Sequence, residues 1–141
     1  MKKNFLKIRK QDPFMNFCGG LWLRTLSKNK YEFTSKITND HIDSLGRCEN
    51  GFISTLIDAG LGAAAQSCVL NRFNDEDGQQ CITISLGINF LNEVKNLGFL
   101  VGTAKVTKKT KNFIFMNSNL YFKKKKVAYA SGIWKIKKGI K

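Results

Sequence analysis

The segment 51–70 places the strongest limit on how this chain can fold. Its twenty residues contain one charged side chain, Asp58, among apolar and small residues. A segment this long and apolar can cross a membrane, but a lone carboxylate near the middle of a span is costly. Repeated glycine and alanine also make the segment small rather than strongly lipophilic. We therefore expect a helix buried inside a globular domain, with neighbouring backbone approaching closely at 59–65.

Alternating apolar and polar residues on both sides of this helix predict half-buried strands. Before the helix we expect a short helix or turn over 13–19, strands over 21–27 and 31–37, and an irregular loop over 38–50. After the helix, which the polar stretch 71–80 ends, we expect a series of strands and lysine-rich turns: strand 82–90, strand 99–107, turn 108–111, strand 113–122, turn 123–126 and strand 127–136. Successive strands joined by short turns predict an antiparallel meander.

The predicted architecture is therefore α+β, with an antiparallel sheet curled around one long central helix. The 141 residues suit one domain, and neither a linker nor an internal repeat interrupts them. We expect a single domain over 1–141, in which 1–12 form a basic N-terminal lead-in.

The charge is distributed unevenly along the chain. Residues 94–141 hold 13 lysines and no acid, whereas residues 1–93 hold 11 basic and 10 acidic side chains. A net charge of +14 fits a binder of nucleic acid or membrane surfaces, or a domain that handles an anionic ligand. Nucleic-acid binding is the less favoured alternative, because most phenylalanines fall on the strand face that should pack on the helix.

The number and spacing of cysteine and histidine residues limit the metal sites that this chain could form. The four cysteines form no CxxC pair and the chain has one histidine, so we expect no metal site. The basic start lacks the apolar stretch of a secretory signal. We expect a cytoplasmic protein with reduced cysteines and no membrane span.

Residues 41–58 carry a pattern that resembles a known family. The pattern is H-x-(N/D)-x-x-G, a glycine at the helix start, and T-L-x-D, here His41, Asp43, Gly46, Gly51, Thr55, Leu56 and Asp58. It is similar to that of the hotdog-fold acyl-CoA thioesterases typified by phenylacetyl-CoA thioesterase. The likeness continues through 82–100 and covers residues 14–136, and its strand–turn–strand signature falls on Asn89, Phe90, Leu91 and Gly98.

The resemblance implies a hotdog fold and hydrolysis of an acyl- or aryl-CoA thioester. The chain departs from the family where many members have His-Gly-Gly, because it has Glu49-Asn50-Gly51 there. Many members also have Asn at Asp43 and a proline after Leu91, whereas Asp58 is retained. The alternative is a non-catalytic hotdog protein that binds an acyl-CoA or another lipid-like ligand.

Thioester hydrolysis needs an activated water or a nucleophile, and stabilisation of the carbonyl oxygen as it becomes negative. Asp58 is the candidate for the first task, either as a general base or as a nucleophile that forms an anhydride. Its structural alternative is a carboxylate that bonds a backbone group or a charge at an interface. In the family a backbone N–H at the helix start polarises the carbonyl, and Gly51 and Asn50 occupy that place here. We expect Asn50 to adopt the left-handed conformation that glycine favours, or to cap the helix.

Two further residues match family positions near the reaction centre. Asp43 falls where an Asn often holds the attacking water, and its alternative is a loop residue that makes a turn. Thr83 falls where a Ser or Thr faces the reaction centre, and its alternative is an outward strand residue. We expect His41 to be structural and Glu49 to be solvated.

The lysine-rich turn is a candidate binding site for coenzyme A. Lysines at a pocket mouth attract phosphates, and the candidates are Lys108, Lys109, Lys111 and Asn112. In the family this turn, or its dimer-related neighbour, lies near the bound nucleotide. The alternative is solvated lysines that protect strand edges. Coenzyme A would be part of the substrate, so no separate cofactor is expected.

A single hotdog unit leaves one sheet face and the sheet edges uncovered. Phe115, Tyr121, Tyr129 and Ile133 are expected on the face opposite the helix. The resemblance implies a homo-oligomer, either a dimer or a dimer of dimers, whose active sites use residues of both chains.

Overall fold

The computed structural model describes residues 4–72, 74 and 79–137. The start of the predicted lead-in, part of the polar stretch after the helix and the last four residues lie outside the described residues. The elements follow in the order β1 (Leu6–Ile8), α1 (Pro13–Phe17), β2 (Leu21–Ser27), β3 (Lys30–Ile37), η1 (Asn39–His41), α2 (Asn50–Leu70), β4 (Cys81–Phe90), β5 (Gly98–Lys109), β6 (Phe113–Phe122) and β7 (Lys125–Ile136). The strand β1 corrects the expectation that residues 1–12 form only a polar lead-in.

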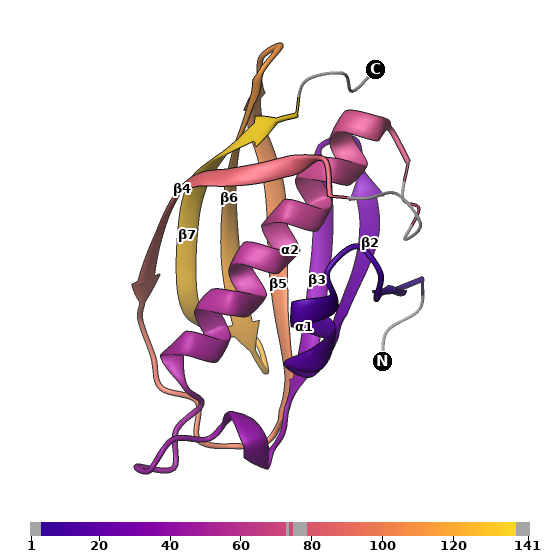
Figure 1. Ribbon diagram of the computed structural model, residues 1–141. Coiled ribbons are helices and arrows are strands. Elements are labelled where there is room, and N and C mark those ends of the chain that lie inside the picture. Colours follow the sequence, from indigo (N-terminus) through magenta and orange to yellow (C-terminus); the bar gives the residue numbers. More distant parts are fainter. Residues whose placement is uncertain (1–3, 73, 75–78, 138–141) are drawn as a thin grey trace.

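The strands form one antiparallel sheet that curves around α2 (Figure 1). Their order across the sheet is β1-β2-β3-β5-β6-β7-β4. Strands β5, β6 and β7 form the predicted meander, but β4 pairs with β7 and not with β5. The prediction that β4 neighbours β5 is wrong because 91–97 are not a tight turn: they carry the chain past the start of α2 to the other side of the meander.

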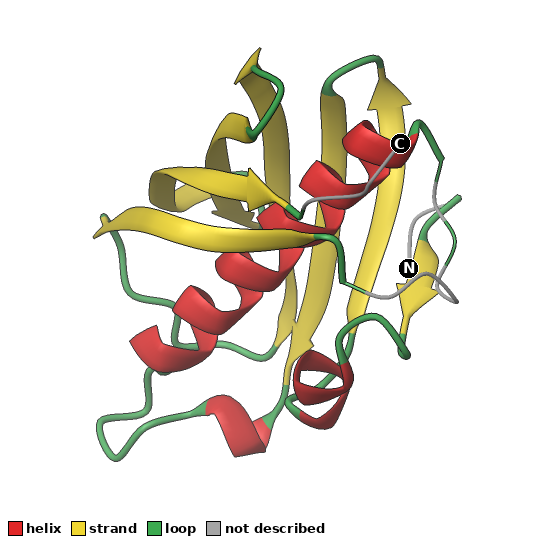
Figure 2. Cartoon of the chain, turned by 45° about the horizontal axis from the view of Figure 1, so that its top comes forward, coloured by secondary structure: helices red, strands yellow, loops and turns green. Residues whose placement is uncertain are grey.

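The helix α2 lies in the concave face of this sheet, as Figure 2 shows, and its inward side forms the centre of the core. It ends at Asn71, whose left-handed backbone (φ 54°) lets its N–H and that of Arg72 bond to the last carbonyls of the helix. Within the described part of the chain, α2 is the one helix long and apolar enough to cross a membrane. More than half of its most apolar stretch, 56 %, is buried inside the protein.

Glycines at the contact between α2 and the sheet make room for one aromatic ring. The buried Phe33 of β3 lies against Gly60 of α2 and Gly102 of β5, and a Cβ at either glycine would come within 2.7 Å of three ring carbons. The close approach expected around 59–65 is therefore made by the Phe33 side chain, and not by the backbone of a neighbouring element.

A bulge in β4 changes which side chains face the helix. Thr83 pairs with Trp134 and Ser85 pairs with Ile133, so Ile84 is an extra residue in the ladder. The apolar alternation expected for 82–90 therefore does not stay on one face. Ile82 and Ile84 are about half exposed, at 52 % and 54 %, while Thr83 faces α2.

Candidate functional site

Asp58 and Thr83 meet where α2 faces the edge strand β4. The hydroxyl of Thr83 donates a hydrogen bond of 2.7 Å to Oδ1 of Asp58. Both side chains are half-buried, and with Ala59, Gly62 and Gln66 they line a small pocket of about 50 Å³. The outward alternative for Thr83 is therefore wrong: the bulge at Ile84 lets Thr83 point at the carboxylate. For the second oxygen of Asp58 the described residues provide no hydrogen-bond donor.

The first turn of α2 presents unpaired backbone donors. Glu49 is the N-cap, with an extended backbone and no side-chain capping bond, and Asn50 is the first helical residue. Both expectations for Asn50, a left-handed conformation and an N-cap, are thus wrong. Within the described residues the structure gives the N–H groups of Asn50 and Gly51 no acceptor. Such free donors at the positive end of a helix dipole suit a developing negative charge.

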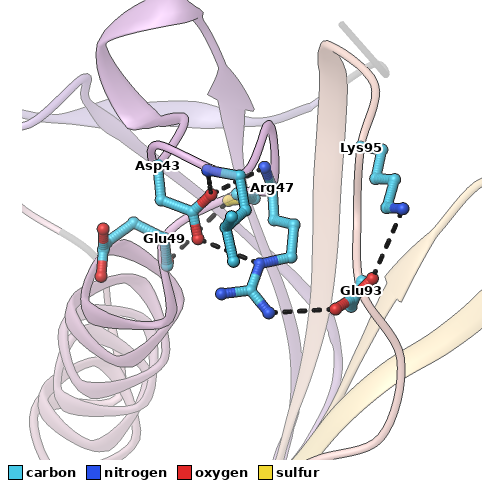
Figure 3. A network of polar contacts seen from close by, with 7 residues as sticks. Asp43, Arg47, Glu49, Glu93 and Lys95 are labelled. Atoms are coloured by element: carbon cyan, nitrogen blue, oxygen red, sulfur yellow. Dashed lines mark hydrogen bonds and ion pairs between the residues drawn. The ribbon is translucent and has the colours of Figure 1, made fainter.

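A network of charged side chains braces the loop that leads into α2 (Figure 3). Oδ1 of Asp43 accepts hydrogen bonds from the backbone N–H groups of Leu45 and Arg47, and its Oδ2 accepts one of 3.1 Å from Nε of Arg47. The guanidinium of Arg47 also donates to Glu93 at 3.0 Å, and Glu93 lies 3.7 Å from Lys95. Asp43 therefore stabilises a turn, which was the structural alternative to its role near the reaction centre. It also orients Arg47 toward Glu93 in the link between β4 and β5.

Both carboxylates of this network are stabilised in their charged form. The backbone N–H of Arg47 is the main cause that lowers the pKa of Asp43, and the Arg47 guanidinium is the main cause that lowers the pKa of Glu93. The backbone joins the same two segments, because the N–H of Cys48 donates to the carbonyl of Val94 at 2.7 Å. These segments border a pocket of about 190 Å³ beside Asn50 and Ile53. Sequence reasoning missed Arg47 and Glu93, which lie 46 residues apart with no local signal that pairs them.

His41 is held as a structural residue. Its Nδ1 accepts a hydrogen bond of 2.9 Å from the N–H of Thr38, and its Nε2 lies 2.6 Å from the carbonyl oxygen of Cys18, to which it donates. Its ring stacks on Phe52 with 3.7 Å between centroids. Both ring nitrogens are used, so His41 connects α1 to the start of α2. Glu49 has an exposed side chain, as expected.

The candidate lysines lie at the other end of α2. Strand β5 extends through Lys108 and Lys109, so the predicted turn over 108–111 is wrong and the chain reverses at 110–112 instead. Lys109 lines a pocket with Ser67 and Cys68, close to the end of α2. At 1.5 Å per residue, Ser67 is about 24 Å from Gly51 along the helix. A single chain therefore does not bring these lysines to the helix start.

The structure thus brings Asp58 and Thr83 together and separates them from the other candidates. Gly51 lies seven residues before Asp58, about 10 Å along the helix axis. Asp43 borders the pocket at the helix start, and not the pocket of Asp58. Among the described residues no group of three or more His, Cys, Asp or Glu side chains could hold a metal ion.

Comparison with known structures confirms the fold. A phenylacetic acid degradation-related protein from Ralstonia eutropha, provisionally named a thioesterase, superposes with a TM-score of 0.69 at 19% identity, over 81% of this chain and 83% of that one. A mutant of the phenylacetic acid degradation protein PaaI from Thermus thermophilus gives a TM-score of 0.73 at 18% identity, over 89% of this chain and 99% of that one. The sheet wrapped around α2 is the hotdog fold, as predicted.

Sequence comparison defines the family. Residues 45–128 match the model of the thioesterase superfamily. A Pseudomonas aeruginosa protein provisionally named an esterase is 24% identical over 132 residues, which cover 94% of each chain. The chain belongs to the thioesterase superfamily, which confirms the predicted enzyme class of thioester hydrolases.

Proposed function

We propose that this protein hydrolyses acyl-CoA thioesters and that Asp58 carries the reaction. The observation on which the proposal rests is the hydrogen bond from Thr83 of β4 to Asp58 of α2. It fixes one carboxylate oxygen, and among the described residues the other has no partner, as a group that must take a proton or attack a carbonyl requires. The reaction uses water and the coenzyme A carried by the substrate, and no other cofactor.

Two routes lead to the same products. As a general base, Asp58 takes a proton from water, the water oxygen attacks the thioester carbonyl carbon, and the carbon–sulfur bond breaks as the proton passes to the thiolate. As a nucleophile, the Asp58 oxygen forms an anhydride and expels the thiolate, and water then cleaves the anhydride. In either route the carbonyl oxygen becomes negative and needs a donor such as the N–H of Gly51.

A single chain does not supply that donor to Asp58, because about 10 Å of helix separates Asp58 from Gly51. Strand β4 is the last in the strand order, so no strand of the described chain pairs with its outer edge, and Ile82 and Ile84 on β4 are exposed. We therefore propose a homodimer in which two β4 edges pair in antiparallel fashion. The helices then run in opposite directions, and Gly51 of the partner subunit completes the site of Asp58.

The direct experiment measures thiol release from a panel of aryl-, short-chain and medium-chain acyl-CoA substrates. Asp58→Asn keeps the size of the side chain and should lower kcat by about 10²–10⁴-fold. Thr83→Val should lower turnover, whereas Thr83→Ser keeps the hydroxyl and should retain it. An unchanged melting temperature shows that the fold is intact. Full activity of Asp58→Asn contradicts the proposal, and a wild type that binds coenzyme A but hydrolyses no substrate supports the non-catalytic alternative.

Mixing of inactive variants tests the shared site. Gly51→Pro removes the N–H at a helical position in the first turn, which tolerates proline, and Gly51→Ala is its control because a Cβ there meets only Glu49, at 3.7 Å. Gly51→Pro and Asp58→Asn should each be inactive, but a random mixture should regain about a quarter of the wild-type activity. Mixed dimers without activity would show that the two residues do not share a site.

A further inference from the structure

Trp134 of β7 buries a hydrogen-bond donor. Its side chain is fully buried, and its indole Nε1 has no hydrogen-bond partner among the described residues. A buried donor without an acceptor is costly, so folded proteins nearly always supply one, often as a bound water molecule. The position of this N–H in the fold shows where such a water would lie.

Two glycines fix the orientation of the Trp134 ring. On β7, a Cβ at Gly132 would lie 2.9 Å from Cη2 and Cζ3 of the ring, so the six-membered part of the ring fills the place of that Cβ. On α2, a Cβ at Gly62 would lie 3.6 Å from Nε1. Apart from the helix backbone and the chain neighbours of Gly62, no other described atom lies within 4 Å of that Cβ position. The Nε1 edge of the ring therefore borders a space that Gly62 leaves on α2.

The space at Gly62 adjoins the site of Asp58. Trp134 pairs with Thr83, whose hydroxyl binds Oδ1 of Asp58. Asp58, Gly62 and Thr83 line the same pocket of about 50 Å³, and about 10–15 Å³ of such space holds one water molecule. Residues four apart on a helix lie about 5–6 Å apart at Cβ. A water molecule beside Gly62 is therefore within reach of both the indole N–H and the second oxygen of Asp58.

We propose that Trp134 is a positioning residue, whose indole N–H holds in the space at Gly62 the water molecule that Asp58 deprotonates. The inference rests on the proposed thioesterase function and assigns Asp58 the role of general base. The N–H donates to the water oxygen, and the water donates one proton to Asp58. A lone pair of the water oxygen attacks the thioester carbonyl carbon, the carbon–sulfur bond breaks, and the proton passes from Asp58 to the thiolate.

Nuclear magnetic resonance tests this contact without substrate. The chain has two tryptophans, so a proton–nitrogen spectrum contains two indole signals, which Trp22→Phe assigns. The Trp134 signal should shift as Asp58 ionises, and Asp58→Asn should abolish this titration. Asp12 is the other ionisable residue that lines the pocket, so Asp12→Asn is the control and should retain the titration. A Trp134 signal that does not titrate, or that titrates unchanged in Asp58→Asn, overturns the proposal.

Removal of the N–H without loss of the ring isolates its effect on turnover. The amino acid β-(benzothienyl)alanine has the shape of tryptophan with sulfur in place of the N–H. Incorporated at position 134 of the Trp22→Phe variant, it should lower kcat by about tenfold, the effect of one hydrogen bond, and leave KM nearly unchanged. Trp22→Phe with tryptophan at position 134 is the control and should keep the wild-type kcat. Equal kcat of the two proteins contradicts the role of the N–H.

Gly62→Ala fills the space itself. The added Cβ would lie 3.6 Å from Nε1, which is an ordinary contact, and alanine favours the helix. Stability should therefore be retained, while kcat falls and the titration of the Trp134 signal is lost. Wild-type kcat in Gly62→Ala would show that no water at this position takes part in the reaction.

A single turnover in isotopically labelled water separates the two routes of Asp58. The released acid should carry the label, because the water oxygen attacks the thioester directly. Label in the Asp58 carboxylate indicates the anhydride route and overturns the proposal. If the wild type hydrolyses no substrate, the proposed function fails, and the titration of the Trp134 signal still decides whether the indole is coupled to Asp58.

Discussion

Phe33 explains at the level of single residues why α2 carries glycine. Its ring fills the space between Gly60 of the helix and Gly102 of β5, and either Cβ would overlap the ring. Glycine inside a helix normally costs about 1 kcal/mol relative to alanine. Here the cost is offset because the missing methyl group admits a large buried aromatic side chain.

A pair of matched substitutions tests this packing. Gly60→Ala should lower the free energy of unfolding by about 1–3 kcal/mol, because the new methyl group displaces the Phe33 ring. Gly62→Ala is the control: its Cβ would lie 3.6 Å from the nearest atom, Nε1 of Trp134, which is an ordinary contact. It should leave stability unchanged or raise it through better helix propensity. Urea denaturation measures both, and equal stability of the two variants would show that the ring does not limit position 60.

The loop before α2 shows how two elements are held in place by charge. Asp43 and Glu93 both bind Arg47, and the three residues tie the helix start to the link between β4 and β5. The N–H groups of Asn50 and Gly51, which find no acceptor among the described residues, follow directly after this network. The network therefore positions the proposed oxyanion donors without touching them.

Acid should weaken this brace. The folded state lowers the pKa of Asp43 and Glu93, so their contribution to stability is present above the ordinary carboxyl range, about pH 4, and is lost as the pH falls through the lowered values. Replacing Asp43 with Asn and Glu93 with Gln should flatten the decline of melting temperature below about pH 4. Asp40→Asn, an exposed carboxylate outside the network, serves as the control. An unchanged slope in the double variant would contradict the assigned ion pairs.

Some elements of this fold could be predicted from the sequence and others could not. The buried helix, the strands around it and the thioesterase pattern at Asp58 were predictable, because period and motif are local. The partner of β4 was not, since pairing across the sheet leaves no local trace. The bulge was hidden because its extra residue, Ile84, is itself apolar and continues the alternation. The Asp43–Arg47–Glu93 network was not predicted for the same reason as the partner of β4: Arg47 and Glu93 lie far apart in the sequence, and no local pattern pairs them.

At the scale of the whole molecule, the positive charge falls into groups with different surroundings. Lys108, Lys109 and Lys111 lie at or beyond the end of β5, far from Gly51 of the same chain. Lys105, Lys126 and Lys135 lie on the sheet face opposite α2, and Lys108 reaches the end of the same face because it pairs with Phe115. If the first group holds the phosphates of coenzyme A, it must do so from another subunit or through long-range attraction.

Comparing an acyl-CoA with an acyl-pantetheine tests whether these lysines bind the phosphates of the nucleotide. Replacing Lys108, Lys109 and Lys111 with Gln should raise KM for an acyl-CoA by about tenfold, since charge-assisted contacts to phosphate are lost. KM for the corresponding acyl-pantetheine, which lacks the nucleotide, should not change. Lys105→Gln and Lys126→Gln should leave both values unaltered. A similar rise for the two substrates would show that these lysines do not recognise phosphate.

The position of β4 at the far edge of the sheet also governs when the protein can fold. Cys81 pairs with Ile136 and Phe90 pairs with Ala128, so β4 has no partner until the last strand of the described chain has been made. During synthesis the apolar helix α2 and this strand leave the ribosome well before β7 does. Pairings between residues so distant in sequence form slowly. Before β7 has been synthesised, the chain therefore exposes an apolar helix and an unpaired strand. A variant that lacks β7 should for the same reason be prone to aggregation.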